Sequence, residues 1–128
     1  MARYSRRRGP ASDYALTTAN AVLPGMTLTR FFDEGELLII ARATHKNVTL
    51  SPRDGRIAIA LDGASIFGST AQDNLFDNTW NPLNVTILQP VAAGIHTIAI
   101  LAGGAPVAGN IIEANTAELI VIQLPLWD

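Results

Sequence analysis

Short runs in which hydrophobic and polar residues alternate occupy most of this chain from residue 26 onward. Alternation with a period of two is typical of β-strands, and turn sequences such as Asp33-Glu34-Gly35, Ser51–Gly55 and Asp62-Gly63 separate the runs. Residues 68–82 form the longest irregular segment. The expected strands cover residues 26–31, 36–44, 56–61, 64–67, 83–88, 95–101, 107–112 and 119–124. Because no amphipathic helix stands out, we predict an all-β fold, a jelly-roll-like antiparallel β-sandwich.

The first 23 residues differ in texture from the rest of the chain. Small and polar residues dominate residues 12–21 without a clean period, and the turn-forming dipeptide Pro24-Gly25 follows. We therefore expect two regions, an extended N-terminal arm over residues 1–23 and a β-sandwich domain over residues 24–128.

The last expected strand is apolar on both of its faces. Residues 119–124 are apolar except for Gln123, and Pro125 ends the run. One face of an antiparallel sheet usually meets solvent, so a strand of this kind needs a cover on both sides. We predict that another copy of the chain supplies the second cover. The predicted interface residues are Leu119, Ile120, Val121, Ile122, Leu124 and Trp127.

Composition supports self-association. Hydrophobic residues make up 48% of the 128 residues and charged residues only 16%, with Lys46 as the single lysine. A monomer with so little surface charge is difficult to keep soluble. The chain has no cysteine, which excludes disulfides and thiolate metal sites. No apolar run approaches the roughly twenty residues of a membrane-spanning helix, so we expect no membrane partner.

The small net charge of −2 conceals a basic N-terminus. Four arginines, Arg3, Arg6, Arg7 and Arg8, stand within residues 1–8, and five basic against eleven acidic residues remain elsewhere. A basic tip on an acidic body suits a nucleic-acid arm or a tether to an acidic protein surface. Four phosphate contacts would give only weak attachment, whereas carboxylates bind arginine in bidentate pairs. We predict that these arginines and Tyr4 anchor the arm to neighbouring protein, and that nucleic acid is not the partner.

The residues with catalytic potential are few. The two histidines are His45, which we expect to face solvent, and His96, which is in phase with Ile98 and Ile100 and suits a hydrogen-bonded packing role. Neither has a second ligand at metal-binding spacing, and no Gly-x-Ser-x-Gly motif is present. We therefore predict no catalytic residue, no metal and no cofactor, and a protein that is not an enzyme.

The segment around residues 73–78 offers several oxygen ligands. A calcium loop would need several such oxygens, but the spacing and glycine of an EF-hand are absent. A surface loop pinned by Leu75, Phe76 and Trp80 is the favoured interpretation. Phe76 and Trp80 are also the local aromatic candidates for a ligand-binding loop.

The C-terminal part of the sequence resembles a known group of proteins. Gly94-Ile95-His96-Thr97 with the apolar run after it, and Leu119 to Pro125, match two strand endings of small tailed-phage virion proteins, "G-x-H-T-hydrophobic" and "L-x-V-hydrophobic-x-L-P". Those proteins are similar to tumour-necrosis-factor-like jelly rolls, which assemble as trimers. The resemblance implies a homotrimeric capsid decoration protein that is made in the host cytoplasm, binds the major capsid protein and lies on the capsid exterior of the virion. Residues 26–93 carry nothing diagnostic of that role.

Two alternatives stay open at this point. The first is a tail-tip or fibre-head module that binds a host receptor or carbohydrate through Phe76 and Trp80. The second is a small jelly-roll coat protein whose arginine-rich arm contacts packaged nucleic acid.

Overall fold

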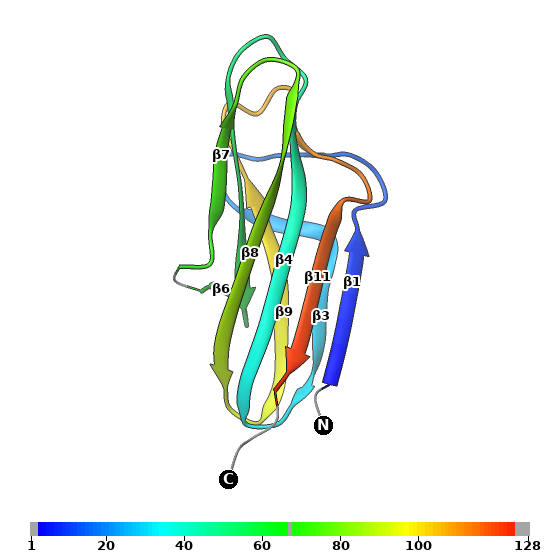
Figure 1. Ribbon diagram of the computed structural model, residues 1–128, viewed down its shortest axis with the longest axis vertical. Coiled ribbons are helices and arrows are strands. Elements are labelled where there is room, and N and C mark those ends of the chain that lie inside the picture. Colours follow the sequence, from blue (N-terminus) through cyan, green and yellow to red (C-terminus); the bar gives the residue numbers. More distant parts are fainter. Residues whose placement is uncertain (1–2, 67, 125–128) are drawn as a thin grey trace.

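The computed structural model describes residues 3–66 and 68–124, which form β-strands and no helix (Figure 1). The strands are β1 (Arg3–Gly9), β2 (Tyr14–Ala15), β3 (Ala21–Phe32), β4 (Gly35–Asn47), β5 (Arg53–Leu61), β6 (Ala64–Ser65), β7 (Ala71–Leu75), β8 (Thr79–Val91), β9 (Gly94–Gly103), β10 (Asn110–Ile112) and β11 (Ala117–Gln123).

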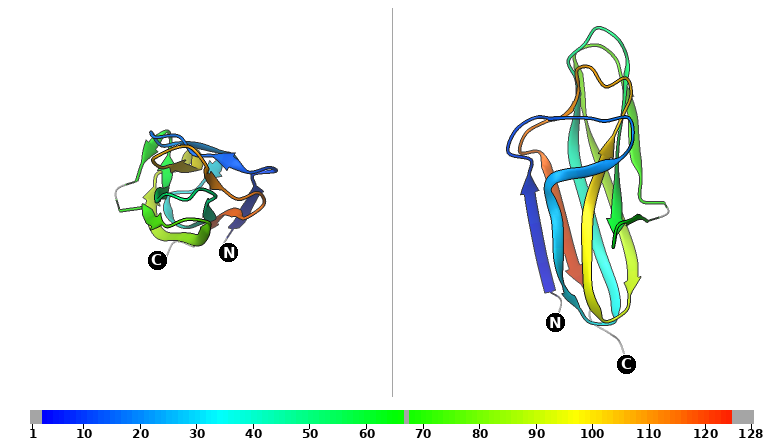
Figure 2. Two further views of the ribbon diagram at one scale, coloured as in Figure 1. Left: turned by 90° about the horizontal axis from the view of Figure 1, so that it is seen from above. Right: turned by 180° about the vertical axis from the view of Figure 1, so that it is seen from behind.

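Two antiparallel sheets pack face to face. The first sheet has the order β1-β11-β4-β8; β10 pairs with the last residues of β4, and β2 pairs with β10. The second sheet has the order β3-β9-β5, and β6 and β7 both pair with β5. Most connections between the longer strands cross from one sheet to the other, and Figure 2 shows the two layers from above and from behind. The predicted all-β sandwich is confirmed.

Alternation along β4 shows why the core forms between the sheets. Leu37, Ile39 and Ala41 point inward and are fully buried, while the residues between them face out. Ile57, Ile59, Ile98 and Ile100 of the second sheet complete the centre of the core, and Phe32, Leu119 and Val121 extend it toward the β3–β4 turn and β11. The loops after β4, β7 and β9 gather at the opposite end from that turn, here called the upper end (Figure 1).

The segment over residues 68–82 is more regular than its sequence indicates. It contains β7 and the first residues of β8. The inward position at the middle of β7 is a polar residue, Asp73, which hides the alternation from a hydrophobic pattern. Pro82 lies within β8, where its missing N–H is tolerated because β8 pairs on one side only, with β4. Conversely, the strand expected over residues 107–112 is shortened to β10.

The N-terminal segment contributes a strand to the sandwich. Residues 3–9 pair with β11 along their whole length, from Arg3 opposite Gln123 to Gly9 opposite Ala117. The expected boundary at residue 24 falls inside β3. Residues 3–9 join the sheet because β11 would otherwise present a free edge of unpaired N–H and C=O groups. The backbone of an extended basic segment can form hydrogen bonds with these groups.

Candidate interaction surfaces

The closing strand β11 lies inside the first sheet, between β1 and β4. Leu119 and Val121 face the second sheet and are 0% and 1% exposed. Ile120 and Ile122 point to the other side of the sheet and are half-buried. The inner face of the strand is thus covered by the chain itself, and its outer face is not.

The outer face of the first sheet carries a continuous aliphatic surface. In the strand register Ile122 stands opposite Leu38, and Leu38 stands opposite Leu88 on β8; Ile120 stands opposite Ile40 in the next row. Leu88 is 56% exposed and the other four are half-buried. We call these five residues the outer patch; the view in Figure 1 looks onto this sheet.

The predicted interface residues therefore separate into four groups. Leu119 and Val121 have no surface to offer a partner. Ile120 and Ile122 belong to the outer patch, and Leu124, just after β11, is half-buried with its backbone N–H bonded to the Glu36 carbonyl at 3.0 Å. Trp127 lies outside the described residues.

A buried carboxylate borders the outer patch. The Glu118 side chain is only 4% exposed and forms ion pairs with Arg6 of β1 and Arg42 of β4. The two arginine side chains are 43% and 55% exposed, so they shield the carboxylate from water while remaining hydrated themselves. A carboxylate that is buried to this degree requires such partners, because desolvating an unpaired charge is costly.

The remaining residues proposed for the arm stand along the same edge. Arg7 and Arg8 are exposed, and the Arg7 guanidinium donates to the Arg6 carbonyl at 3.1 Å. The backbone of Arg3 and Tyr4 pairs with β11, and their side chains lie outside the described part of the structure. Arg6 is thus engaged within its own chain, whereas Arg7 and Arg8 present guanidinium groups to solvent.

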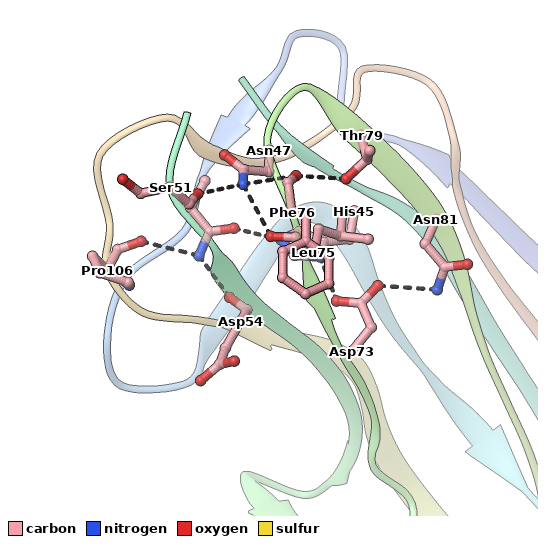
Figure 3. A network of polar contacts seen from close by, with 11 residues as sticks. His45, Asn47, Ser51, Asp54, Asp73, Leu75, Phe76, Thr79, Asn81 and Pro106 are labelled. Atoms are coloured by element: carbon pink, nitrogen blue, oxygen red, sulfur yellow. Dashed lines mark hydrogen bonds and ion pairs between the residues drawn. The ribbon is translucent and has the colours of Figure 1, made fainter. Parts of the chain in front are cut away.

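The upper end is held together by a buried polar network centred on His45 (Figure 3). The His45 ring is fully buried; Nδ1 contacts Asp73 Oδ1 at 2.5 Å, and Nε2 contacts Asn110 Oδ1. The Asn110 amide donates to the Asp54 carbonyl at 2.6 Å, which fixes its oxygen toward the histidine. The second oxygen of Asp73 accepts from the Asn81 amide at 3.0 Å. This network joins β4, β5, β7, β8 and β10.

The expectation that His45 faces solvent is wrong. His45 continues the inward-facing row of β4 that begins with Leu37 and Ile39. Because it is separated from these residues by an even number of positions, the sequence already indicated that it faces the core. The ring is accommodated because residue 55 on the facing strand is glycine: a β-carbon there would overlap the imidazole.

His96 occupies a more open position near the β8–β9 turn. Its Nδ1 bonds Asp62 Oδ2 at 2.7 Å and its Nε2 bonds the Ala92 carbonyl at 2.7 Å, as expected for a hydrogen-bonded packing histidine. The bond to Asp62 raises the pKa of His96 above 6.5, with the Ala92 carbonyl adding to the effect. The same contact, with the Thr97 N–H, lowers the pKa of Asp62 below 3.8.

The two aromatic residues of the alternative ligand loop lie on different elements. Phe76 lies in the loop after β7 and Trp80 on β8, and each is 67% exposed. Trp80 stands opposite Lys46 and lines a depression of about 360 Å³ together with Lys46 and Glu113. Lys46 and Glu113 were not anticipated from the sequence, because they meet Trp80 only through the strand register.

The described residues contain no group of three or more histidine, aspartate or glutamate side chains that could hold a metal ion. They also include no helix suited to span a membrane.

Comparisons with known proteins agree on the architecture. No protein-family model and no curated protein sequence matches the chain. Among solved structures, Eiger TNF from S. frugiperda superposes with a TM-score of 0.64 at 6% identity, over 99% of this chain and 95% of that one. A chain of infectious bursal disease virus Gx strain superposes with a TM-score of 0.62 at 13% identity, over 95% of this chain and 32% of that one. The fold is a jelly roll.

Proposed function

We propose that this protein is a structural component of a virus particle that self-associates through the outer patch and decorates the exterior of a capsid. A jelly roll alone does not define a function. The proposal combines the jelly-roll fold, which the chain shares with a protein of infectious bursal disease virus, with the phage-type strand endings in the sequence. The single observation that carries it is the outer patch.

The chemistry of the outer patch is that of an interface between subunits. Five aliphatic side chains lie on one open sheet face, and the ion-paired Arg6, Arg42 and Glu118 border them. An apolar centre with a charged rim is the usual anatomy of a protein interface, and contiguous exposed apolar surface on a soluble protein marks such a site. A homotrimer is the assembly that the resemblance to tumour-necrosis-factor-like jelly rolls implies.

In this proposal the exposed arginines of β1 contact the major capsid protein. Arg7 and Arg8 are exposed, neither guanidinium forms an ion pair within the described residues, and both could pair with carboxylates in bidentate geometry. Arg3 and Tyr4 belong to the same proposed anchor. A protein that binds only the assembled shell stabilises it by mass action, with no chemical step required.

The self-association test compares two exposed aliphatic residues on opposite faces. Leu88→Asp places a charge in the outer patch, and Ile95→Asp places one on the second sheet, where Ile95 is 71% exposed. Light scattering should give an oligomeric mass for the wild type and for Ile95→Asp, and a monomeric mass for Leu88→Asp. A monomeric wild type, or equal behaviour of the two variants, would refute the role of the outer patch.

The anchoring test leaves the fold intact. Arg7→Gln/Arg8→Gln should reduce co-sedimentation with capsids assembled from the major capsid protein, while the protein's own oligomeric mass stays unchanged. Neutral substitutions are used because Arg8 stands opposite the buried Glu118, which would repel a second carboxylate. The matched control is Arg56→Gln, since Arg56 lies on the second sheet, where it bonds Asn20 and the Thr18 carbonyl. Undiminished capsid binding by the double variant would remove the anchoring role.

A further inference from the structure

The depression lined by Lys46, Trp80 and Glu113 is a second surface that self-association does not require. It lies near the upper end of the first sheet, in the rows beyond the outer patch. The volume of about 360 Å³ is at the small end of the range for small-molecule sites, about 300–1,000 Å³.

The fold holds these three side chains in place by strand parity. Trp80 points outward because its neighbour Asn81 points inward, to Asp73, and Leu83 is buried. Lys46 points outward because His45 and Asn47, on either side of it, are fully buried. Glu113 follows β10, and its backbone N–H bonds the Thr44 carbonyl at 2.9 Å. The depression is therefore built on paired strands that the His45 network fixes from behind.

The three groups are free to bind. Within the described residues, the Lys46 ammonium and the Glu113 carboxylate form no side-chain hydrogen bond or ion pair. The indole ring of Trp80 also forms no aromatic or cation–π contact within the described residues. The contacts of these kinds found there are Phe32 with His96 and Arg30 with Phe32. The depression is therefore lined by one hydrogen-bond donor group, the Lys46 ammonium, one acceptor group, the Glu113 carboxylate, and one exposed aromatic ring, that of Trp80.

We propose that this depression binds a neutral sugar ring. The apolar C–H face of a pyranose can lie on the indole of Trp80, which offers a rigid, amphipathic surface. A sugar hydroxyl both donates and accepts, so adjacent hydroxyls can accept from Lys46 and donate to Glu113. The opposite charges of Lys46 and Glu113 cancel, and each repels one class of ion. A neutral ligand is therefore favoured over an acidic or an amino sugar.

Another occupant is a side chain from a second copy of the protein, since an exposed tryptophan is also a common anchor of protein interfaces. That occupant predicts a change of oligomeric mass when Trp80 is truncated. The sugar site predicts none, and it holds whether or not the chain decorates a capsid.

The experiment uses saturation-transfer NMR and calorimetry on the whole protein. The probes are methyl glycosides of glucose, galactose and mannose, with N-acetylneuraminic acid and glucosamine as charged comparators. We expect at least one neutral glycoside to bind, and Trp80→Ala to weaken that binding by about tenfold or more. Glu113→Gln and Lys46→Met should each weaken it several-fold. Phe76→Ala is the matched control, because Phe76 has the same exposed fraction but does not line the depression.

Three outcomes would overturn the proposal. They are no binding of any neutral glycoside at tens of millimolar, binding that is unchanged in Trp80→Ala, and a loss of affinity in Phe76→Ala equal to that in Trp80→Ala. Tighter binding of a charged comparator would contradict the neutral preference. A Trp80→Ala variant with a lower oligomeric mass by light scattering would assign the depression to a subunit contact instead.

Discussion

Glu118 on β11 and Arg42 on β4 stand directly opposite each other in the strand register and form an ion pair on the outer face of the first sheet. Arg6 of β1 pairs with the second oxygen of the same carboxylate. Three strands that are far apart in the sequence thus meet at one nearly buried charge.

This arrangement predicts a non-additive response to mutation. Arg6→Ala or Arg42→Ala alone should lower the free energy of unfolding by about 1 kcal/mol, because the other arginine still neutralises Glu118. The double variant leaves the carboxylate buried without a cation and should cost about 3 kcal/mol or more. Chemical denaturation of the three variants measures the coupling. Strictly additive losses would show that Glu118 is adequately solvated without either partner.

The contact between Gly55 and the His45 ring predicts a steric penalty. Gly55→Ala places a methyl group where the imidazole lies and should destabilise the fold by about 1–3 kcal/mol, as overpacking of a core does. In a His45→Ala background the same substitution meets an open space and should cost much less. Thermal unfolding of the four combinations tests this coupling, and an equal penalty in both backgrounds would contradict it.

The pair of His96 and Asp62 predicts a dependence of stability on pH. The pKa of His96 is raised, so its contribution is complete below pH 6.5 and declines as the pH rises through the raised value. The pKa of Asp62 is lowered, so its contribution is complete above pH 3.8 and declines as the pH falls through the lowered value. The pair therefore stabilises most between these limits. Because it is solvent-accessible, we expect less than about 1 kcal/mol.

The difference in melting temperature between the wild type and His96→Gln checks this pH dependence. It should be largest at mildly acidic pH and should shrink toward pH 8. A constant difference across that range would show that the ionised pair does not contribute.

The pairing of β1 with β11 predicts what N-terminal truncation does. Removing residues 1–9 exposes the edge of β11 and takes Arg6 from Glu118, so the protein should become less stable and more prone to aggregate. Unfolding curves and sedimentation of the truncated protein measure both effects. Substituting Arg7 and Arg8 alone should leave stability nearly unchanged. If truncation leaves stability and solubility unaltered, β1 is dispensable to the fold.

Much of the strand pattern was accessible from the sequence, because side-chain direction alternates along a strand and is a local property. The alternation around Leu37 and Ile39 predicted β4, and Asp62-Gly63 predicted the turn after β5. The two-faced apolar character of β11 was also visible, and it pointed to a cover on both sides. Even the burial of His45 follows from its parity with Leu37, although its polar nature concealed this.

What only the tertiary structure decided is which strands lie side by side and in which register. Glu118 finds Arg42 76 residues away, and His45 finds Asn110 65 residues away. The position of residues 3–9 as an edge strand, and the meeting of Trp80 with Lys46 and Glu113, have the same origin. Pairing between distant strands depends on the packing of the whole core and on backbone hydrogen bonds that any residue type can form. The hydrophobic pattern along one strand therefore does not indicate which other strand it pairs with.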